Sequence, residues 1–273
     1  MGRKDIVDPA ELAKLLAATT SSQGLASQLS DEEFEAIRSL VYKQFGIHLS
    51  DQKRSLVVAR LQQILRARGL SGFKDYCEYL AKDSTGAALD ELVNRITTNH
   101  TFFFRERAHF DYFSDIALPG LVEKLKNTNK RDIRIWCAGC SSGEEPYTLA
   151  MLMMEFFGMD FSSWDAGVLA TDISGKVLAV AQKGEYSEER LSGVPAGMRH
   201  KYFEKLPGGM WRVKDRLKKE VTFRRFNLMN KQFPFKQAFH MIFCRNVMIY
   251  FDHQSRNDLV GRFHTFTRPG GLL

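Results

Sequence analysis

The segment from residue 133 to residue 157 constrains the fold of this chain more than any other. It starts with Ile133–Cys137, whose β-branched and aromatic residues are typical of a strand. A turn of small residues, Ala138–Gly143, follows, and then the apolar run Pro146–Phe157 predicts a helix. A strand that leads through a short turn into a helix begins a βαβ unit, so we expect a parallel sheet.

The alternation of strands and helices continues toward the C-terminus. The segment 184–220 interrupts it and is longer than a connection between a strand and a helix needs, so we predict an inserted subdomain there. Residues from Gly270 onward are typical of the start of a strand, so we expect the natural chain to continue beyond Leu273. The other elements predicted are strands at Gly167–Thr171, Val221–Phe226 and His240–Phe243, and helices at Val177–Lys183 and Ser255–Phe266.

The first part of the chain has an all-helical pattern. We predict a flexible leader over residues 1–29, then a helical domain over 30–97, and the α/β domain over 98–273. Ser30 and Glu33 have the spacing of a capping box, and apolar residues at helical spacing follow until Gly46. Three further helices are predicted between Asp51 and Gly69, around Phe73–Leu80 and around Leu89–Ile96.

Composition excludes several classes of protein. Hydrophobic residues make up 44% of the chain and charged residues 26%, which is typical of a globular protein. The longest apolar run, 149–159, contains Glu155 and is shorter than the roughly 18–20 residues of a membrane span. Four cysteines are too few for a disulfide scaffold, and the N-terminus lacks the apolar core of a signal peptide. We therefore expect a cytoplasmic protein, whose net charge of +7 favours acidic partners without identifying one.

The turn after the first predicted strand is compatible with two chemistries based on a nucleophile. Cys137 and Cys140 have the Cys-x-x-Cys spacing of redox proteins, although a buried cysteine is the simpler interpretation. Gly139–Gly143 fits the G-x-S-x-G pattern of hydrolases, and Asp172 and His264 follow in the order of a catalytic triad. Against a hydrolase, the turn follows the first strand, and no oxyanion-hole sequence precedes it.

A third chemistry is the binding of a nucleotide-like cofactor. Small residues let backbone amides approach a ligand at the start of the helix. Glu144 and Glu145 would repel a pyrophosphate but tolerate the sulfonium and ammonium groups of S-adenosylmethionine. Asp172 ends the next predicted strand, where an acidic residue can hold ribose hydroxyls. The simpler interpretations are a capping role for Asp172 and helix-dipole stabilisation by the two glutamates, about 0.3–1 kcal/mol each.

Three strings of residues together resemble one family. They are Thr97–Glu106 (TTNHTFFFRE), Ser141–Tyr147 (SSGEEPY) and Phe243–Asp252 (FCRNVMIYFD). All are similar to the signatures of chemotaxis receptor methyltransferases (CheR), and the likeness extends from about Leu29 to the last residue. The resemblance implies an α/β protein in which an N-terminal helical domain precedes a Rossmann-like S-adenosylmethionine methyltransferase domain with an inserted small antiparallel β-subdomain.

The resemblance also implies an activity and a set of site residues. The activity is methylation of glutamate side chains on chemoreceptors in bacterial chemotaxis, with S-adenosyl-L-homocysteine as the second product. Arg105 and Tyr250 would act at the substrate end, and no metal is expected. The residues implied to bind the cofactor are Asn99, Thr101, Arg105, Glu145, Asp172, Asn227, Leu228, Arg245 and Asn246.

The implied partner is the acidic helical bundle of a chemoreceptor. The second predicted helix is basic, and we hypothesise that this face docks the receptor, although a solvated basic face is the simpler interpretation. We expect a monomer that binds no nucleic acid and does not insert into a membrane. Two alternatives stay open, namely a methyltransferase for another acidic or nucleic-acid substrate and a non-catalytic cofactor-binding regulatory module. The basic residues of the helix are Lys53, Arg54, Arg60, Arg66 and Arg68.

Overall fold

The computed structural model describes residues 28–273, which form two compact units. The helical unit contains the described residues up to Thr98 together with the segments 227–232 and 248–259. The α/β unit contains residues 99–226, 233–247 and 260–273. The predicted leader lies outside the described residues, except for its last two positions.

The helical unit has the four helices that the sequence predicts. The Ser30 hydroxyl accepts a hydrogen bond from the Glu33 amide at 3.2 Å, and the Glu33 carboxylate accepts one from the Ser30 amide at 2.8 Å, which confirms the capping box. Gly46 ends the first helix with φ of +66°, a conformation that favours glycine. The helices are α2 (Asp31–Phe45), α3 (Arg54–Arg68, preceded by the 3₁₀ turn η1, Asp51–Lys53), α4 (Phe73–Lys82) and α5 (Ala87–Ile96).

Several basic side chains of α3 bind groups of their own unit. Arg54, Arg60 and Arg68 are held in this way, whereas the exposed Arg66 side chain has no ion-pair or hydrogen-bond partner within residues 28–273. Arg66 is therefore the cation of α3 best placed to meet a partner. The three contacts run, in order, to the carbonyl of Leu29 (2.6 Å), Oγ1 of Thr98 (2.9 Å) and the carboxylate of Glu91 (3.1 Å).

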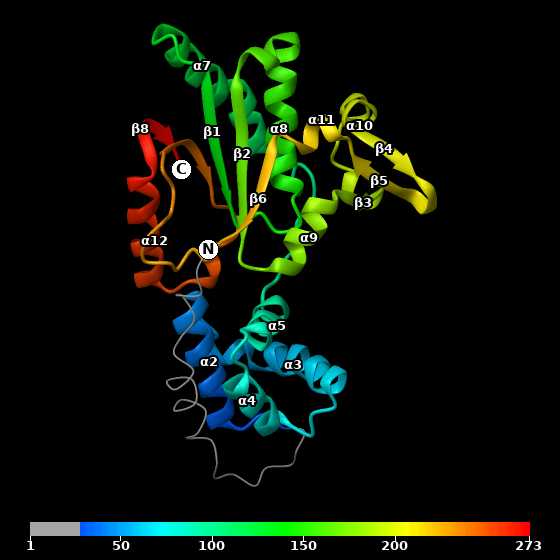
Figure 1. The fold of residues 1–273 in the computed structure, drawn as a ribbon, viewed down its shortest axis with the longest axis vertical. Coiled ribbons are helices and arrows are strands. Elements are labelled where there is room, and N and C mark those ends of the chain that lie inside the picture. The colour runs from blue at the N-terminus through cyan, green and yellow to red at the C-terminus, as the bar shows by residue number, and fades with distance from the viewer. Residues whose placement is uncertain (1–27) are drawn as a thin grey trace. The chain divides into compact units, whose positions relative to one another are not determined.

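The α/β unit is built on a five-stranded sheet with the order β6-β2-β1-β7-β8, in which every pairing is parallel (Figure 1). The predicted strands and helices are present, with ends that shift by a few residues. The strands are β1 (Asp132–Ala138), β2 (Asp165–Asp172), β6 (Val221–Arg225), β7 (Phe239–Phe243) and β8 (Thr267–Leu272). The matching helices are α8 (Glu144–Phe157), α9 (Gly175–Lys183) and α12 (His253–Thr265), of which the part up to residue 259 belongs to the helical unit.

The inserted subdomain is confirmed as a small antiparallel sheet with the order β3-β5-β4, which Figure 1 shows beside the β6 edge of the large sheet. Its elements are β3 (Glu185–Ser187), α10 (Ala196–Tyr202), β4 (Phe203–Leu206), β5 (Met210–Val213) and α11 (Asp215–Lys218). The sequence did not predict the helical run before β1, which consists of α6 (Arg107–Tyr112), the π-helical turn η2 (Phe113–Ala117) and α7 (Leu118–Asn127).

The two faces of β1 pack into different cores. Ile133, Ile135 and Cys137 belong to the core that also contains the buried residues of α8. Trp136 points to the opposite face, as strand periodicity requires, and its indole N–H donates to Oγ1 of Thr171 at 2.9 Å. This bond joins the carboxyl ends of β1 and β2, where the candidate site begins. Five phenylalanine rings surround Trp136 at centroid distances of 4.7–6.0 Å, namely Phe226, Phe233, Phe235, Phe239 and Phe263.

Candidate functional site

The predicted site residues of the α/β unit gather at the carboxyl edge of the large sheet. The parallel strands β1, β2 and β7 all end at this edge, and ligands of open α/β sheets bind there. Glu145 lies in the first turn of α8, directly after the β1 turn, and Asp172 is the last residue of β2. Arg245 and Asn246 follow β7.

The turn after β1 depends on two glycines and on Asp172. Gly139 and Gly143 have φ of +87° and +96°, and a Cβ atom on Gly139 would lie 2.3 Å from the Val247 side chain. The Asp172 carboxylate accepts hydrogen bonds from the backbone amides of Ser141 (2.8 Å) and Ser174 (2.9 Å). Burial raises the pKa of Asp172, and the amide hydrogen bonds oppose that rise. Asp172 therefore fixes the turn and remains an acceptor at the sheet edge.

The two adjacent glutamates of α8 have different roles. The side chain of Glu144 is 0% exposed, pairs with Arg190 at 2.8 Å and accepts a hydrogen bond from the Ser142 hydroxyl at 2.8 Å. Burial raises the pKa of Glu144, and Arg190 opposes this effect. Glu144 is thus part of the packing, and Glu145, whose side chain is 14% exposed, is the one available to a ligand.

Glu145 is held by two donors. Nη1 of Arg245 donates to its Oε2 at 2.7 Å, and the Cys137 thiol donates to its Oε1 at 3.0 Å. Burial raises the pKa of the Glu145 carboxyl, and the Arg245 charge and the thiol hydrogen bond counteract this. A nearly buried carboxylate of this kind is a strong site for a positively charged ligand group.

Glu106 has no role predicted from the sequence, and the structure places it against two predicted site residues. Its carboxylate accepts hydrogen bonds from Nδ2 of Asn246 (3.1 Å) and Nη2 of Arg245 (3.1 Å), and these bonds lower its pKa. Nη2 of Arg245 also donates to the backbone carbonyl of Arg105 at 2.5 Å. The signal in the sequence that could have identified Glu106 is its position directly after Arg105, within the family signature Thr97–Glu106.

The loop that carries Asn99, Thr101 and Arg105 belongs to the same edge. The Ser141 hydroxyl donates to the Asn99 carbonyl at 3.2 Å, which joins this loop to the β1 turn. The Arg105 guanidinium donates to the carbonyl of His100 at 2.6 Å, and Thr101 is half-buried on the loop. Unfavourable backbone conformations concentrate in these loops, as is common at functional sites. The non-glycine residues with positive φ there are Phe104, Glu106, Ser141 and Asn246.

Three predicted site residues belong to the helical unit. Nδ2 of Asn227 donates to the carbonyl of Gln44 at 2.7 Å, and Leu228 is buried. The carbonyl of Tyr250 accepts a hydrogen bond from the His48 amide at 2.8 Å. The Tyr250 ring lies under the ammonium group of Lys53, 5.6 Å from the ring centroid.

The geometry does not support the two chemistries based on a nucleophile. Cys137 and Cys140 are free and buried, and burial raises the pKa of each thiol well above its usual range. The Ser141 hydroxyl donates to a carbonyl, and Asp172 binds backbone amides instead of a histidine. Within residues 28–273 no group of three or more His, Cys, Asp or Glu residues is arranged to hold a metal ion.

Comparison with known families decides between the remaining interpretations. Residues 99–273 match the family described as "CheR methyltransferase, SAM binding domain", and residues 32–97 match "CheR methyltransferase, all-alpha domain". This chain belongs to the CheR methyltransferase family. Its α/β unit therefore contains an S-adenosylmethionine-binding domain, as the sequence analysis predicted.

Relatives of the CheR family match over most of their length. The chain is 42% identical to the chemotaxis protein methyltransferase of Borreliella burgdorferi, over 90% of this chain and 87% of that protein. It is 39% identical to a probable chemotaxis protein methyltransferase of Rhizobium etli, over 86% and 87%. The chemotaxis protein methyltransferase of Escherichia coli is 37% identical, over 90% and 83%.

The carboxyl edge fits the charge of S-adenosylmethionine. The cofactor carries an ammonium and a sulfonium group and no phosphate, and the edge offers the carboxylates of Glu145 and Asp172. The missing side chain of Gly139 lets the β1 turn pack against Val247, the residue after Asn246, which holds the turn at this edge. Within residues 28–273 no helix is long and apolar enough to cross a membrane.

Proposed function

We propose that this CheR family member transfers the methyl group of S-adenosylmethionine to glutamate side chains of chemoreceptors and so forms methyl esters. The partner is the acidic cytoplasmic helical bundle of a receptor, and the enzyme acts in the cytoplasm. The family match and the relatives support a methyltransferase of chemotaxis. The choice of a carboxylate as acceptor rests on the charges of the site.

The cofactor roles follow from the positions of the acidic side chains. Glu145 binds the methionine ammonium group of the cofactor, because it is a nearly buried carboxylate beside the β1 turn. Asp172 accepts from the ribose hydroxyls, because its two oxygens retain acceptor capacity beyond the two amide bonds. Asn99, Thr101 and Arg105 line the same edge from their loop, and Asn246 does so from the end of β7. The resemblance supports the same role for Asn227 and Leu228.

The observation that carries the proposal is the position of Arg105 at this edge. The Arg245 guanidinium lies against the backbone of Arg105, with Nη2 2.5 Å from the Arg105 carbonyl. Arg245 is 12% exposed and bound to Glu145 and Glu106, whereas Arg105 is 27% exposed and only shares Glu106 at 3.7 Å. Arg105 is therefore the cation at this edge that can meet an anionic acceptor. A glutamate carboxylate is such an acceptor, whereas a protonated amine is not.

The reaction depends on how the chain positions the acceptor carboxylate more than on proton transfer. Bound S-adenosylmethionine supplies an electrophilic methyl group on sulfur. A glutamate carboxylate is ionised near neutral pH, so no strong general base is needed. The task of Arg105 is to orient the incoming carboxylate, and alignment of this kind is a large source of rate enhancement. Tyr250 is assigned to the substrate end by the resemblance alone.

The proposal is tested by mass spectrometry of a chemoreceptor cytoplasmic fragment incubated with the enzyme and S-adenosylmethionine. We expect one added methyl group on individual glutamates, and we expect mild alkali to remove it. Methyl groups on lysine, arginine or nucleic acid would survive alkali and would show a different acceptor. A receptor fragment with the modified glutamates changed to alanine is the matched control and should stay unmodified at those positions.

A further inference from the structure

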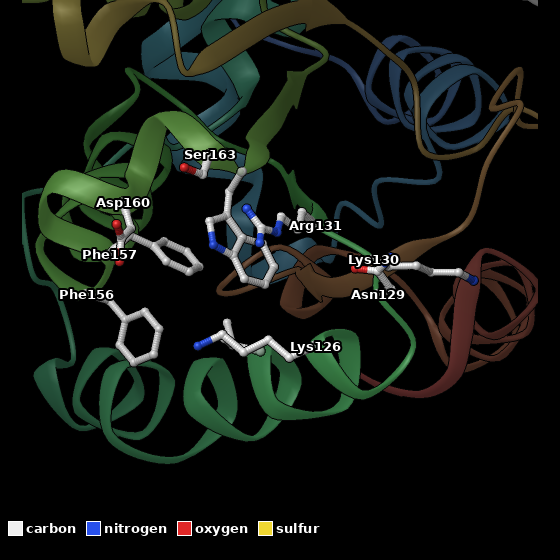
Figure 2. Close-up of a pocket in the computed structure, with 10 residues that line it drawn as sticks. Lys126, Asn129, Lys130, Arg131, Phe156, Phe157, Asp160 and Ser163 are labelled. Atoms are coloured by element: carbon white, nitrogen blue, oxygen red, sulfur yellow. The ribbon is translucent and has the colours of Figure 1, made fainter.

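A pocket lies at the amino-terminal edge of the large sheet, opposite the candidate site, and Figure 2 shows the residues that line it. It has a volume of about 540 Å³ and is lined by the end of α7, the residues just before β1 and the segment between α8 and β2. Arg131 precedes β1 and Trp164 precedes β2, and the Asp165 amide donates to the Arg131 carbonyl at 2.8 Å. At roughly 3.3 Å per strand residue, the seven residues of β1 separate this pocket from the carboxyl edge by about 20 Å.

The end of α7 places the basic residues at this pocket. The Lys130 amide donates to the Leu125 carbonyl at 2.9 Å, and the Asn129 amide donates to the Lys126 carbonyl at 3.0 Å. This is the bond pattern of a Schellman motif, and Asn129 takes the left-handed conformation that the motif needs, with φ of +53°. The motif reverses the chain, so that Lys126 and Arg131 both line the pocket.

Aromatic rings form the other wall of the pocket. The rings of Phe157 and Trp164 are 4.7 Å apart at an angle of 33°, and the ring of Phe156 meets that of Phe157 edge-on at 5.0 Å. Phe156 is 40% exposed, and Trp164 is half-buried, so neither residue is fully covered by the protein. Exposed aromatic rings that line a pocket suit a planar ligand ring.

The cations of the pocket are not neutralised by the protein. Within residues 28–273, Lys126 and Arg131 have no ion pair. Asp165 and Asp132, the nearest carboxylates in sequence to these strand starts, bind Arg134 (2.9 Å) and Arg268 (2.8 Å) instead.

The side chains of Lys126 and Lys130 point in different directions. Figure 2 shows the Lys126 side chain running toward Phe156, whereas the Lys130 side chain extends away from the labelled aromatic residues. Asp160 lines the same pocket from the aromatic side and also has no ion pair within the described part of the chain.

We propose that this pocket binds a nucleoside monophosphate at a site separate from the cofactor site. Lys126 and Arg131 bind the phosphate, whose charge of about −1.5 to −2 at neutral pH matches two cations. Phe156 and Trp164 stack on the base, and the Asp160 carboxylate accepts from the ribose hydroxyls. The pocket volume lies within the usual range of small-molecule sites, about 300–1,000 Å³.

The test is calorimetric titration of the full chain with adenosine 5′-monophosphate in the presence of saturating S-adenosylhomocysteine. The homocysteine derivative occupies the cofactor site, so that adenosine recognition there does not contribute. We expect saturable binding to the wild-type chain. Lys126→Ala and Arg131→Ala should each weaken it at least tenfold, and Lys130→Ala, which removes the same charge from the same turn, less than threefold.

Two reference ligands complete the design. Adenosine lacks the phosphate and inorganic phosphate lacks the ring, so each should bind at least tenfold more weakly than the monophosphate. The proposal is overturned if the wild-type chain gives no saturable heat. It is also overturned if Lys126→Ala and Arg131→Ala bind the monophosphate as tightly as the wild type does, or if inorganic phosphate binds as tightly as the monophosphate. Both substituted side chains are exposed, so these variants should fold normally.

Discussion

Arg245 organises the charges at the carboxyl edge of the sheet. Its side chain is 12% exposed and binds one carboxylate on each side, Glu145 at 2.7 Å and Glu106 at 3.1 Å. Burial raises the pKa of Glu145, whereas hydrogen bonds lower the pKa of Glu106. As pH falls, Glu145 is therefore protonated before Glu106. A prediction follows for each residue.

The first prediction concerns cofactor affinity and pH. If Glu145 holds the cofactor ammonium group as proposed, only its ionised form attracts that group, so affinity is full above the pKa of Glu145 and is lost as pH falls through it. Because burial raises this pKa, the loss should begin above the ordinary glutamate value of about 4.3. Calorimetry with S-adenosylhomocysteine from about pH 8 down to about pH 5 measures it.

Two variants control this prediction. Glu145→Gln should bind the cofactor more weakly and with little dependence on pH. Glu144→Gln removes a buried ion pair with Arg190, so it should lower the free energy of unfolding and keep the pH dependence of binding. A pH dependence that persists unchanged in Glu145→Gln would contradict the role of this carboxylate.

The second prediction concerns Glu106 as a positioning residue. Glu106→Gln removes a charged acceptor from Arg245 and Asn246, and such bonds contribute about 1.5–3 kcal/mol. We expect kcat for receptor methylation to fall by about ten- to hundredfold, together with a lower Tm, because the same hydrogen bonds also contribute to stability. Asp111→Asn, a substitution of another acidic residue on the neighbouring helix α6, should leave kcat unchanged. A lower Tm with normal kinetics would show that Glu106 is only structural.

At the scale of elements, local patterns predicted most of the fold. The capping box at Ser30, the left-handed glycine at Gly46 and the strand–turn–helix sequence after Ile133 each depend on residues close together in the chain. The run α6–η2–α7 was missed because α6 starts without a side-chain N-cap and because a π-helical turn interrupts the periodicity of the run. The residue pattern predicted the inserted sheet only as a long segment, since pairing of three- and four-residue strands is a tertiary property.

The residues of the candidate site could be predicted from the sequence, but the contacts between them could not. The strings around Arg105, Glu145 and Arg245 are far apart in the chain, and the sequence does not show that Arg245 joins the other two. The residue pattern alone gave Glu144 and Glu145 equal weight, and only the resemblance selected Glu145, because the burial of Glu144 depends on Arg190, which lies in the inserted segment. For the same reason, the basic face of α3 looked uniform although three of its arginines bind their own unit.

The third prediction follows from this difference within α3. Arg66→Glu should raise the KM for a receptor fragment by up to about fivefold, since an exposed ion pair contributes about 0.2–1 kcal/mol, and should leave cofactor affinity and Tm unchanged. Arg54→Glu should instead lower Tm, because Arg54 binds the Leu29 carbonyl and Asp31. Lys74→Glu makes the same charge change at an exposed position of α4 and is the matched control. An unchanged KM in Arg66→Glu would exclude this face as a docking surface.

At the scale of the whole molecule, the division into units does not follow the chain. Two segments that come after β6 and β7, residues 227–232 and 248–259, belong to the helical unit. Among the predicted site residues, Asn227, Leu228 and Tyr250 lie in these segments. Sequence periodicity reports only neighbours along the chain, so it cannot show that a segment has joined a distant domain. Residues from both units therefore enter the predicted set.

Methylation of a carboxylate by this chain is tested most directly by one assay. The enzyme is incubated with S-adenosylmethionine labelled in the methyl group and a chemoreceptor cytoplasmic fragment, and the product is then treated with alkali. Methyl esters release methanol in base, whereas methylated amines do not. We expect volatile label only when receptor is present, with normal yield for Lys74→Glu and little for Arg105→Ala. Label that stays on the protein after alkali would contradict the account.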